Sequence, residues 1–230
     1  MSRLSIIIPV LDEAAGIASL LASLAPLRTR GAEVLVVDGG SRDGTPERAA
    51  AADRVLAAPR GRASQMNAGA AAACGDVLVF LHADTRLPAE ADRLILDGLA
   101  ASKRCWGRFD VAIAGRSAAL PLVACLMNAR SRLTGIATGD QAMFMTREAF
   151  AAIGGFPDIS LMEDIETSRR LKRLSAPLCL SARVVTSGRR WDKQGTLRTI
   201  LLMWRLRLAH FFGTAPDILA RRYGYAPRQS

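Results

Sequence analysis

The chain has 230 residues, of which 50% are hydrophobic and 23% are charged, and this balance excludes a disordered protein and suits one domain with a sizeable core. Its 31 basic and 21 acidic side chains give a formal net charge of +10, so we expect an anionic partner such as a nucleotide phosphate, a nucleic acid or an acidic membrane surface. Charges or prolines interrupt every apolar run before the about 18 residues of a membrane span, so no transmembrane segment is expected.

Four cysteines are scattered along the chain, at Cys74, Cys105, Cys125 and Cys179. No two of them have the close spacing of a zinc ribbon or a redox motif. We expect no secretory leader, because the sequence begins without the apolar segment typical of one. We therefore expect a cytoplasmic protein with four buried, reduced thiols.

The first half of the chain alternates between apolar strands and helices. Residues 4–10 form a short β-branched run that is typical of a strand buried on both faces of a sheet. A helix capped by Asp12 is expected next, because apolar residues recur at helical spacing from Ile17 to Leu24, before Pro26. The alternation then repeats, with strands expected at 34–37, 55–56 and 77–81 and helices after Thr45, from about Ala63 and after Pro88. Right-handed crossovers make this an α/β fold with a mostly parallel central sheet and helices on both faces.

After Cys105 the alternation becomes irregular. We expect a strand at 108–114, an apolar stretch at 118–127 and a strand at 141–145. There is no Pro-, Gly- or Ser-rich linker and no repeat, so the second half completes the same domain. We predict one domain over residues 1–195, followed by an amphipathic helix and tail over 196–230.

Polar residues follow the strands where ligands bind in such sheets, at the carboxyl ends. The first strand is followed by Asp12 and Glu13, the second by Asp38, and the fourth by His82 and Asp84. Asp38 opens a glycine-rich turn, where it either binds a base or ribose or satisfies nearby backbone amides. His82 and Asp84 share one side of an extended segment, which suits a divalent cation, Mg²⁺ or Mn²⁺, unless Asp84 only begins a turn.

Two further groups of residues are candidates for chemistry. Glu163 and Asp164 open a helix that ends in basic residues, which suits either the helix dipole alone or a general base facing a cleft. Arg62 and Asn67 follow the third strand on the ligand edge, where they either hold a nucleotide phosphate or lie on a solvated face.

The C-terminal segment combines apolar and basic residues. Arg190 and Trp191 precede a stretch, 196–213, in which apolar residues fall near helical spacing with arginines among them. This helix either lies on an anionic membrane, such as the inner face of the cell membrane, or packs on the domain or on a second subunit in a homodimer.

Together, five segments in this order resemble the family 2 inverting glycosyltransferases of GT-A fold: Pro9 to Glu13, Val36 to Thr45, Leu81 to Asp84, Gly139 to Gln141, and Glu163-Asp164. The resemblance covers nearly the whole chain. It implies a GT-A-type, Rossmann-like three-layer sandwich. Residues 61–70 and 187–191 are similar to a bacterial subgroup associated with radical SAM or selenium-related genes.

The resemblance implies a donor site for a nucleotide-sugar. Glu13 and Asp38 would hold the uracil and ribose of a UDP-sugar, and Pro9 would shape the pocket. Asp84, with His82 beside it, would coordinate Mg²⁺ or Mn²⁺ against the diphosphate.

It also implies the remaining roles. Asp164, paired with Glu163, would be the catalytic base. Asp140, with Gln141, would lie by the acceptor or donor sugar. The alternative is that these residues only form an ordinary loop. Arg190 and Trp191 resemble a basic-aromatic motif that closes over the diphosphate.

The chain departs from the family pattern at three positions. Gly39 stands where many relatives have a second acidic residue, and Asp12 stands where many have asparagine. His82 replaces the first aspartate of the metal motif, and a neutral imidazole is a weaker partner for Mg²⁺ than a carboxylate.

The function expected from the resemblance is an inverting transfer of a sugar from a nucleotide-sugar donor to an acceptor hydroxyl. A lipid-linked acceptor would supply such a hydroxyl. Two alternatives stay open. One is a metal-dependent nucleotidyltransferase, although its usual lysine-bearing phosphate loop is missing. The other is a basic membrane-surface module without catalysis. A nucleic-acid partner is not expected, since only 5% of residues are aromatic and no nucleic-acid motif is present.

Overall fold

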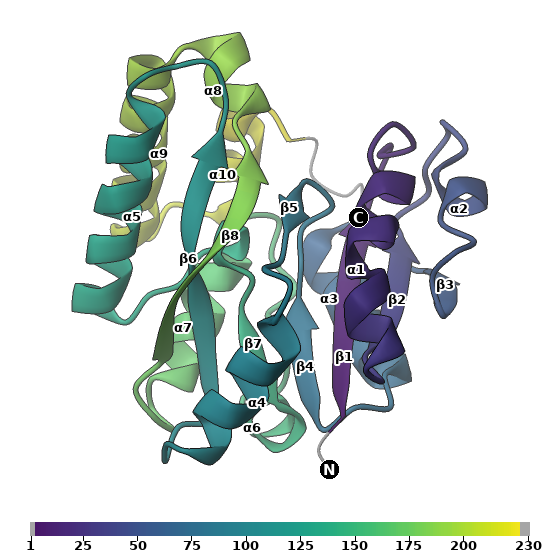
Figure 1. Ribbon diagram of the computed structural model, residues 1–230. Helices are drawn as coiled ribbons and strands as arrows, with labels where there is room; N and C mark the ends of the chain where they lie inside the picture. Colours follow the sequence, from purple (N-terminus) through teal and green to yellow (C-terminus); the bar gives the residue numbers. More distant parts are fainter. Residues whose placement is uncertain (1–2, 226–230) are drawn as a thin grey trace.

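The computed structural model describes residues 3–225, and in these residues eight strands form one sheet in the order β3-β2-β1-β4-β7-β6-β8-β5 (Figure 1). The strands are β1 Leu4–Val10, β2 Glu33–Asp38, β3 Arg54–Ala57, β4 Val77–Phe80, β5 Thr85–Arg86, β6 Trp106–Ala114, β7 Phe144–Thr146 and β8 Leu178–Ser187. Only β7 and β5 run against the other strands. The expected α/β fold with a mostly parallel sheet is confirmed.

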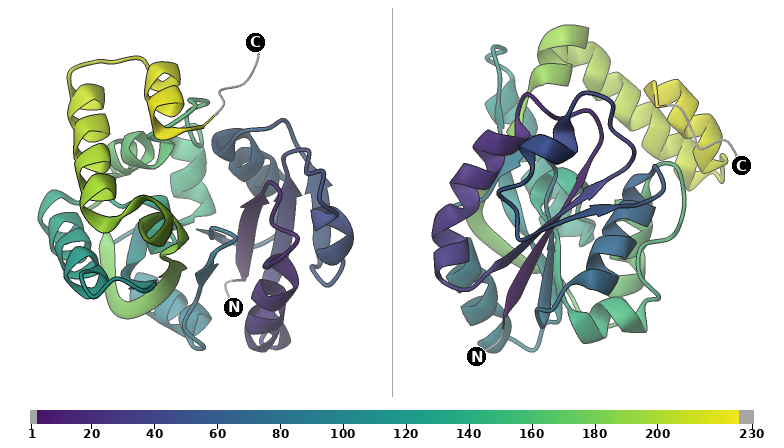
Figure 2. Two further views of the ribbon diagram at one scale, coloured as in Figure 1. Left: turned by 90° about the horizontal axis from the view of Figure 1, so that it is seen from above. Right: turned by 90° about the vertical axis from the view of Figure 1, so that its right-hand side faces the viewer.

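Helices cover both faces of this sheet (Figure 2). They are α1 Ile17–Thr29, α2 Thr45–Arg48, α3 Arg62–Ala72, α4 Ala91–Ala100, α5 Leu120–Thr134, α6 Arg147–Ala152, α7 Glu163–Leu171, α8 Arg189–Gln194, α9 Thr196–Phe211 and α10 Pro216–Tyr223, with a 3₁₀ turn at Gly139–Gln141. One core cluster lies under α1, α4 and α5, and a second lies under α3 and α6. The layers are therefore helix, sheet and helix.

The central strands supply both layers by alternation. Ile6 and Ile8 of β1 enter the first cluster and Ile7 enters the second, because successive side chains of a strand point to opposite faces. Helix α3 lies close against β1 through Gly69, where an added Cβ would lie 2.4 Å from a methyl carbon of Ile7. This contact fixes the start of α3 at the carboxyl ends of β1 and β2.

Local details differ from the sequence-based predictions. Asp12 does not cap α1, which begins after Gly16 without a side-chain cap; its carboxylate accepts a hydrogen bond from the Arg42 backbone N–H instead. Pro26 lies inside α1, and the strand expected at 141–145 begins only at Phe144, because a 3₁₀ turn occupies the preceding residues.

The prediction of four buried thiols is wrong. Cys74 and Cys125 are exposed, and Cys105 and Cys179 are partly buried. Cys74 follows the end of α3, and Cys125 lies on the outer side of α5, so neither position belongs to the core.

The last two helices pack on the domain through a small third cluster. Leu206 of α9 and Leu219 of α10 are buried against Leu161, Met162 and Ile165 at the start of α7. Of the segment predicted over 196–230, residues 226–230 lie outside the described residues. No helix in the described part of the chain has the length and apolar character that a bilayer crossing requires.

Candidate functional site

A cavity of about 1150 Å³ opens at the carboxyl ends of β1, β6 and β8. This is the upper edge of the sheet in Figure 1, where α8, α9 and α10 also lie. Eight of the predicted site residues line it: Pro9, Glu13, Arg62, His82, Asp84, Asp140, Arg190 and Trp191. They come from five separate segments of the chain, and the fold brings them to one cavity.

The loop that carries Glu13 is held by the turn after β2. The backbone N–H of Glu13 donates to the Thr45 hydroxyl at 2.9 Å, and the N–H of Asp12 donates to the Ser41 hydroxyl at 2.9 Å. Asp12 has a left-handed backbone with φ 54°, which these bonds help to maintain. Glu13 is therefore presented to the cavity by a fixed loop.

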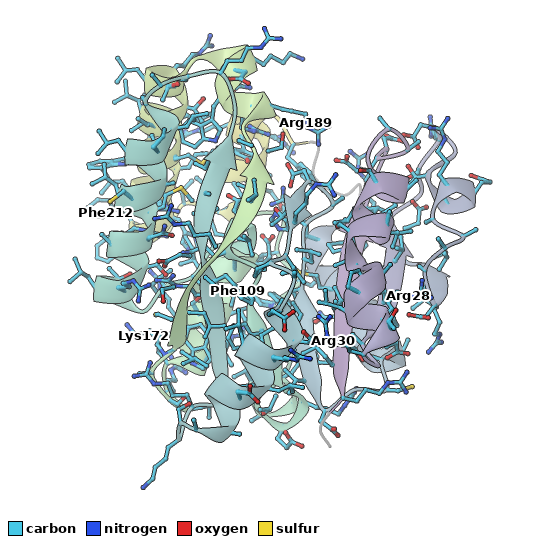
Figure 3. All side chains as sticks on the ribbon, in the orientation of Figure 1. Arg28, Arg30, Phe109, Lys172, Arg189 and Phe212 are labelled. Carbon is cyan, nitrogen blue, oxygen red and sulfur yellow. The ribbon has the colours of Figure 1, made fainter. Side chains whose placement is uncertain are left out.

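Glu13 and Asp84 share one cation. A guanidinium nitrogen of Arg189 lies 3.3 Å from a Glu13 carboxylate oxygen and 3.9 Å from an Asp84 oxygen. Figure 3 shows Arg189 at the upper edge, on the side of α8 that faces the N-terminal half. The two carboxylates thus converge on a position that already favours positive charge.

His82 and Asp140 form a second pair on the cavity wall. Nδ1 of His82 lies 3.3 Å from an Asp140 carboxylate oxygen. Burial disfavours the charged form of Asp140, but the hydrogen bond from His82 and the charges of His82, Arg62 and Arg207 hold its pKa below the usual range. The neighbouring Gly139 packs on the imidazole ring, and an added Cβ there would lie 2.3 Å from the ring atoms.

Asp164 lies behind the same loop, at the first turn of α7. Its carboxylate accepts hydrogen bonds from the Gly139 N–H at 3.0 Å and from the Ile165 N–H at 2.7 Å. The N-terminus of a helix is a favourable place for an acidic side chain, because backbone N–H groups point toward it. Asp164 is partly exposed and is joined to Asp140 through Gly139, although it is not itself on the cavity wall.

Its neighbour Glu163 has a different environment. Glu163 is buried, with 4% of the residue exposed, and a carboxylate oxygen lies 3.8 Å from an Arg62 guanidinium nitrogen. Burial, reinforced by the nearby Asp164 charge, raises the pKa of Glu163 above its usual value. Burial alone would lower the pKa of Arg62. The Glu163 carboxylate outweighs this effect, together with Tyr223, Tyr225 and Asp140, so the pKa of Arg62 is raised.

Besides Glu163 and Asp164, three further predicted site residues lie off the cavity wall, and they form hydrogen bonds inside the fold. The Asp38 carboxylate accepts from the N–H groups of Gly40 and Ser41. The Asn67 amide pairs with both backbone groups of Phe156, and the buried Gln141 accepts from the Thr138 N–H. The turn-satisfying interpretation of Asp38 therefore describes its contacts in this structure.

The cavity also contains residues that no sequence motif singled out: Arg130 from α5, Arg207 from α9, and Tyr223 with Tyr225 at the C-terminal end. The Tyr223 ring lies 3.8 Å from the Arg190 guanidinium carbon, and its carbonyl accepts a hydrogen bond from Arg190 at 3.2 Å. One signal was present in the sequence, since Arg207 interrupts an apolar face made by Trp204, Leu208 and Phe211.

Tight binding of a metal at this cavity would need further ligands from a bound substrate. The described residues contain no group of three or more His, Cys, Asp or Glu side chains placed to hold an ion. Asp84 nevertheless fits a jointly held ion, because Mg²⁺ in particular is usually bound by one or two carboxylates together with substrate phosphates. His82 is already paired with Asp140.

A family comparison matches the larger part of the chain. The model described as Glycosyl transferase family 2 matches residues 5–150, which include β1 to β7 and all of the polar strand ends. No curated protein matches the sequence.

Solved structures share the fold. The mannosyltransferase PcManGT from Pyrobaculum calidifontis, in complex with GDP-Man and Mn²⁺, is 22% identical with a TM-score of 0.66, over 98% of this chain and 66% of that chain. Glucosyl-3-phosphoglycerate synthase from Mycobacterium tuberculosis, in complex with Mn²⁺, UDP and glucosyl-3-phosphoglycerate, is 23% identical with a TM-score of 0.62, over 97% and 81%.

A fragment of TarS from S. aureus in complex with UDP-GlcNAc is 18% identical with a TM-score of 0.66, over 80% of this chain and 58% of that chain. The present chain thus spans less than two thirds of the TarS fragment. At these identities, the similarities establish a common fold.

Proposed function

The chain belongs to glycosyl transferase family 2, and from that premise we propose that it transfers a sugar from a nucleotide diphosphate donor, a UDP-sugar, to an acceptor hydroxyl with inversion at the anomeric carbon. The observation that carries the proposal is the cavity in which Glu13, Asp84, Asp140 and Arg190 meet. We also assign the chain to the radical SAM or selenodomain-associated subgroup, on the similarity of residues 61–70 and 187–191.

In this proposal the donor lies along the wall formed by the ends of β1 and β4. Pro9 and Glu13 contact the uridine, and Asp38 shapes the turn behind them. Arg62 and Arg190, the latter stacked on Tyr223, face the diphosphate with positive charge. Trp191 closes the same wall.

Asp84 would hold Mg²⁺ or Mn²⁺ together with diphosphate oxygens, with His82 as a neighbouring ligand. A bound ion supplies positive charge that stabilises the departing nucleotide diphosphate. Arg189 already lies between Asp84 and Glu13, so the same position accepts a cation in the structure.

Asp164 is the proposed general base. Its carboxylate takes the proton of the acceptor hydroxyl while that oxygen attacks the anomeric carbon, and the bond from this carbon to the diphosphate oxygen breaks. The products are the glycosylated acceptor and the nucleoside diphosphate. Glu163 is held in a buried pair with Arg62, which leaves Asp164 as the carboxylate nearer to the cavity loop.

A ligand panel tests the donor assignment. UDP-, GDP- and dTDP-sugars, each with Mg²⁺ or Mn²⁺, are titrated calorimetrically into the full chain, and we expect a UDP-sugar with metal to bind most tightly. Asp84→Asn should weaken this binding by removing the metal ligand, while Asp97→Asn, an acidic side chain of α4 outside the cavity, serves as the control. Absence of binding for every nucleotide-sugar in the panel contradicts the proposal.

We also propose that the outer face of α9 touches the inner surface of the cell membrane. Leu197, Leu201 and Phe212 are exposed by 55 to 75%, and the arginines of α9 are suited to anionic headgroups. Figure 3 shows Phe212 at the outer edge of the molecule.

Flotation with anionic vesicles tests this contact. The protein should float, and Leu201→Ser with Phe212→Ser should abolish flotation. If the protein stays in solution and sediments as a dimer that these substitutions dissociate, the face belongs to a homodimer instead.

A further inference from the structure

The cavity contains two arginines that the donor site does not use. Arg130 of α5 and Arg207 of α9 both line it. Within the described residues, neither guanidinium makes a hydrogen bond or an ion pair, and Nε and Nη2 of Arg130 are buried without a partner. Buried donors of this kind are rare, because each lacks the hydrogen bond that water would supply.

The electrostatics of this pair are unfavourable. Burial, together with the charges of Arg207 and Arg108, lowers the pKa of Arg130 to about 10 despite the opposing charge of Asp164. Burial also lowers the pKa of Arg207, although Asp164 and Asp140 offset part of this. At neutral pH both side chains remain charged, so two cations face the cavity with incomplete compensation.

A neighbouring arginine shows that the fold can pair a buried guanidinium where it serves only the structure, although its Nε also has no partner among the described residues. Arg108 is fully buried, and it pairs with the Asp110 carboxylate while its Nη2 donates to the Asn128 carbonyl at 3.3 Å. Arg130 and Arg207 have no comparable partners among the described residues. Their free donors are therefore available to a ligand that carries negative charge.

The surrounding wall is apolar and open to solvent. Leu126 and Leu133 of α5 and Trp204, Leu208 and Phe211 of α9 line the same cavity and are exposed by 59 to 87%. An apolar surface of this kind, continuous with a charged interior, is complementary to a molecule with a charged head and an apolar body.

We infer that the space between α5 and α9 binds the acceptor, an amphiphilic alcohol whose phosphate group lies against Arg130 and Arg207 and whose apolar chain lies along the exposed leucines and aromatics. The inference rests on the proposed sugar transfer, since Asp164, beside this space, would accept the proton of the alcohol. Two guanidinium groups match the several oxygens of a phosphate.

Binding of dodecyl phosphate, measured by calorimetry at concentrations below its micelle formation, tests the inference without any turnover. The wild-type chain should bind it, and Arg130→Gln with Arg207→Gln should weaken binding about 10- to 100-fold, because the guanidinium groups supply charge-assisted hydrogen bonds to the phosphate. Arg198→Gln, an exposed arginine of α9 outside the cavity, should bind as the wild type does. Equal binding by the double variant overturns the inference.

Two further probes separate the parts of the proposed ligand. Inorganic phosphate should bind much more weakly than dodecyl phosphate, and so should dodecyl maltoside, which has the same chain and a neutral head. If inorganic phosphate binds equally well, the apolar wall has no role. If the maltoside binds equally well, the arginines have none, and either result contradicts the inference.

UDP binding in the same samples distinguishes this inference from the proposed function. The arginine variants should retain the UDP affinity of the wild type, which also shows that they are folded. If they do not fold, Leu133→Ser supplies the test, because this exposed side chain lines the apolar wall and its loss should weaken dodecyl phosphate only. A wild-type chain that binds dodecyl phosphate but no UDP contradicts the donor assignment alone.

Discussion

The two sides of the cavity differ in how far their polar groups are satisfied. On the β1–β4 side, the loop after β1 and the turn after β2 are tied by hydrogen bonds between Asp12, Glu13, Ser41 and Thr45. On the α5–α9 side, the Arg130 and Arg207 guanidinium groups have no partner within residues 3–225, and large apolar side chains face solvent. The difference indicates that one side is rigid before any ligand binds, whereas the other is completed by its ligand.

The largest expected effect is at the junction of the two sides. Asp164→Asn should lower the rate of sugar transfer by about 10²- to 10⁴-fold, the usual contribution of a general base. UDP binding should stay unchanged, because the carboxylate is not on the donor wall. Glu166→Gln on the same helix is the control, and a similar transfer rate in Asp164→Asn and wild type excludes this residue as the base.

Gly139→Ala should lower transfer by about 10²-fold, the effect of a shift of about 1 Å in catalytic groups. The new Cβ would lie 2.3 Å from the His82 ring, so the loop that connects Asp140 with Asp164 must move. Gly16→Ala is the control, since nothing lies within 4 Å of its added Cβ. Steady-state rates for both variants decide whether the loop is a fixed part of the site.

Two substitutions should change stability in opposite directions if the two sides differ as described. Gly69→Ala should lower the free energy of unfolding by about 1 to 3 kcal/mol, because it overpacks the contact of α3 with β1. Arg130→Met should raise it by about 1 to 3 kcal/mol, because a buried charge without a partner is removed. Urea unfolding measures both, and destabilisation by Arg130→Met contradicts the contrast.

Glu163 makes the stability of the folded protein depend on pH. Its raised pKa means that the folded protein holds this proton more tightly than the unfolded chain does. The resulting stability is complete below the unfolded pKa of about 4.3 and is lost as pH rises through the folded pKa. Relative to wild type, Glu163→Gln should therefore gain stability from pH 4 to pH 7 in urea unfolding, and a constant difference contradicts the assignment.

The smallest expected effect concerns the cation between Glu13 and Asp84. Arg189→Gln should tighten Mn²⁺ binding by up to about fivefold, because an exposed ion pair contributes at most about 1 kcal/mol. Lys193→Gln removes a charge from the same helix without that contact and is the matched control. Calorimetry with Mn²⁺ alone separates the two, and weaker binding in Arg189→Gln contradicts the competition.

The sequence predicted what depends on neighbouring residues. The strands from β1 to β4 and the polar residues after them follow from local apolar runs, and the order of parallel strands then brings Glu13 and Asp84 to one edge. Partners distant in sequence were not predictable in this way. Asn67 pairs with Phe156, 89 residues away, and no local pattern shows that its amide is already occupied.

The roles of Arg130 and Arg207 were also not predictable from neighbouring residues. Each arginine belongs to an amphipathic helix whose arginines are ordinarily solvated, and only the packing of α5 and α9 around one cavity buries part of both side chains. Cys74 and Cys125 were predicted as buried from residue type alone. Both are exposed, because Cys74 follows the end of a helix and Cys125 lies on the outer side of one.

The bridge from Arg189 to Glu13 and Asp84 has a consequence for the order of events at the cavity. A divalent ion that binds at Asp84 must displace this guanidinium, which also pairs with Glu13. The freed side chain, carried by α8, can then pair with an anion. A diphosphate that binds together with the ion supplies this anion. Ion and nucleotide should accordingly favour each other's binding, so that titrating either in the presence of the other yields a higher affinity than titrating it alone.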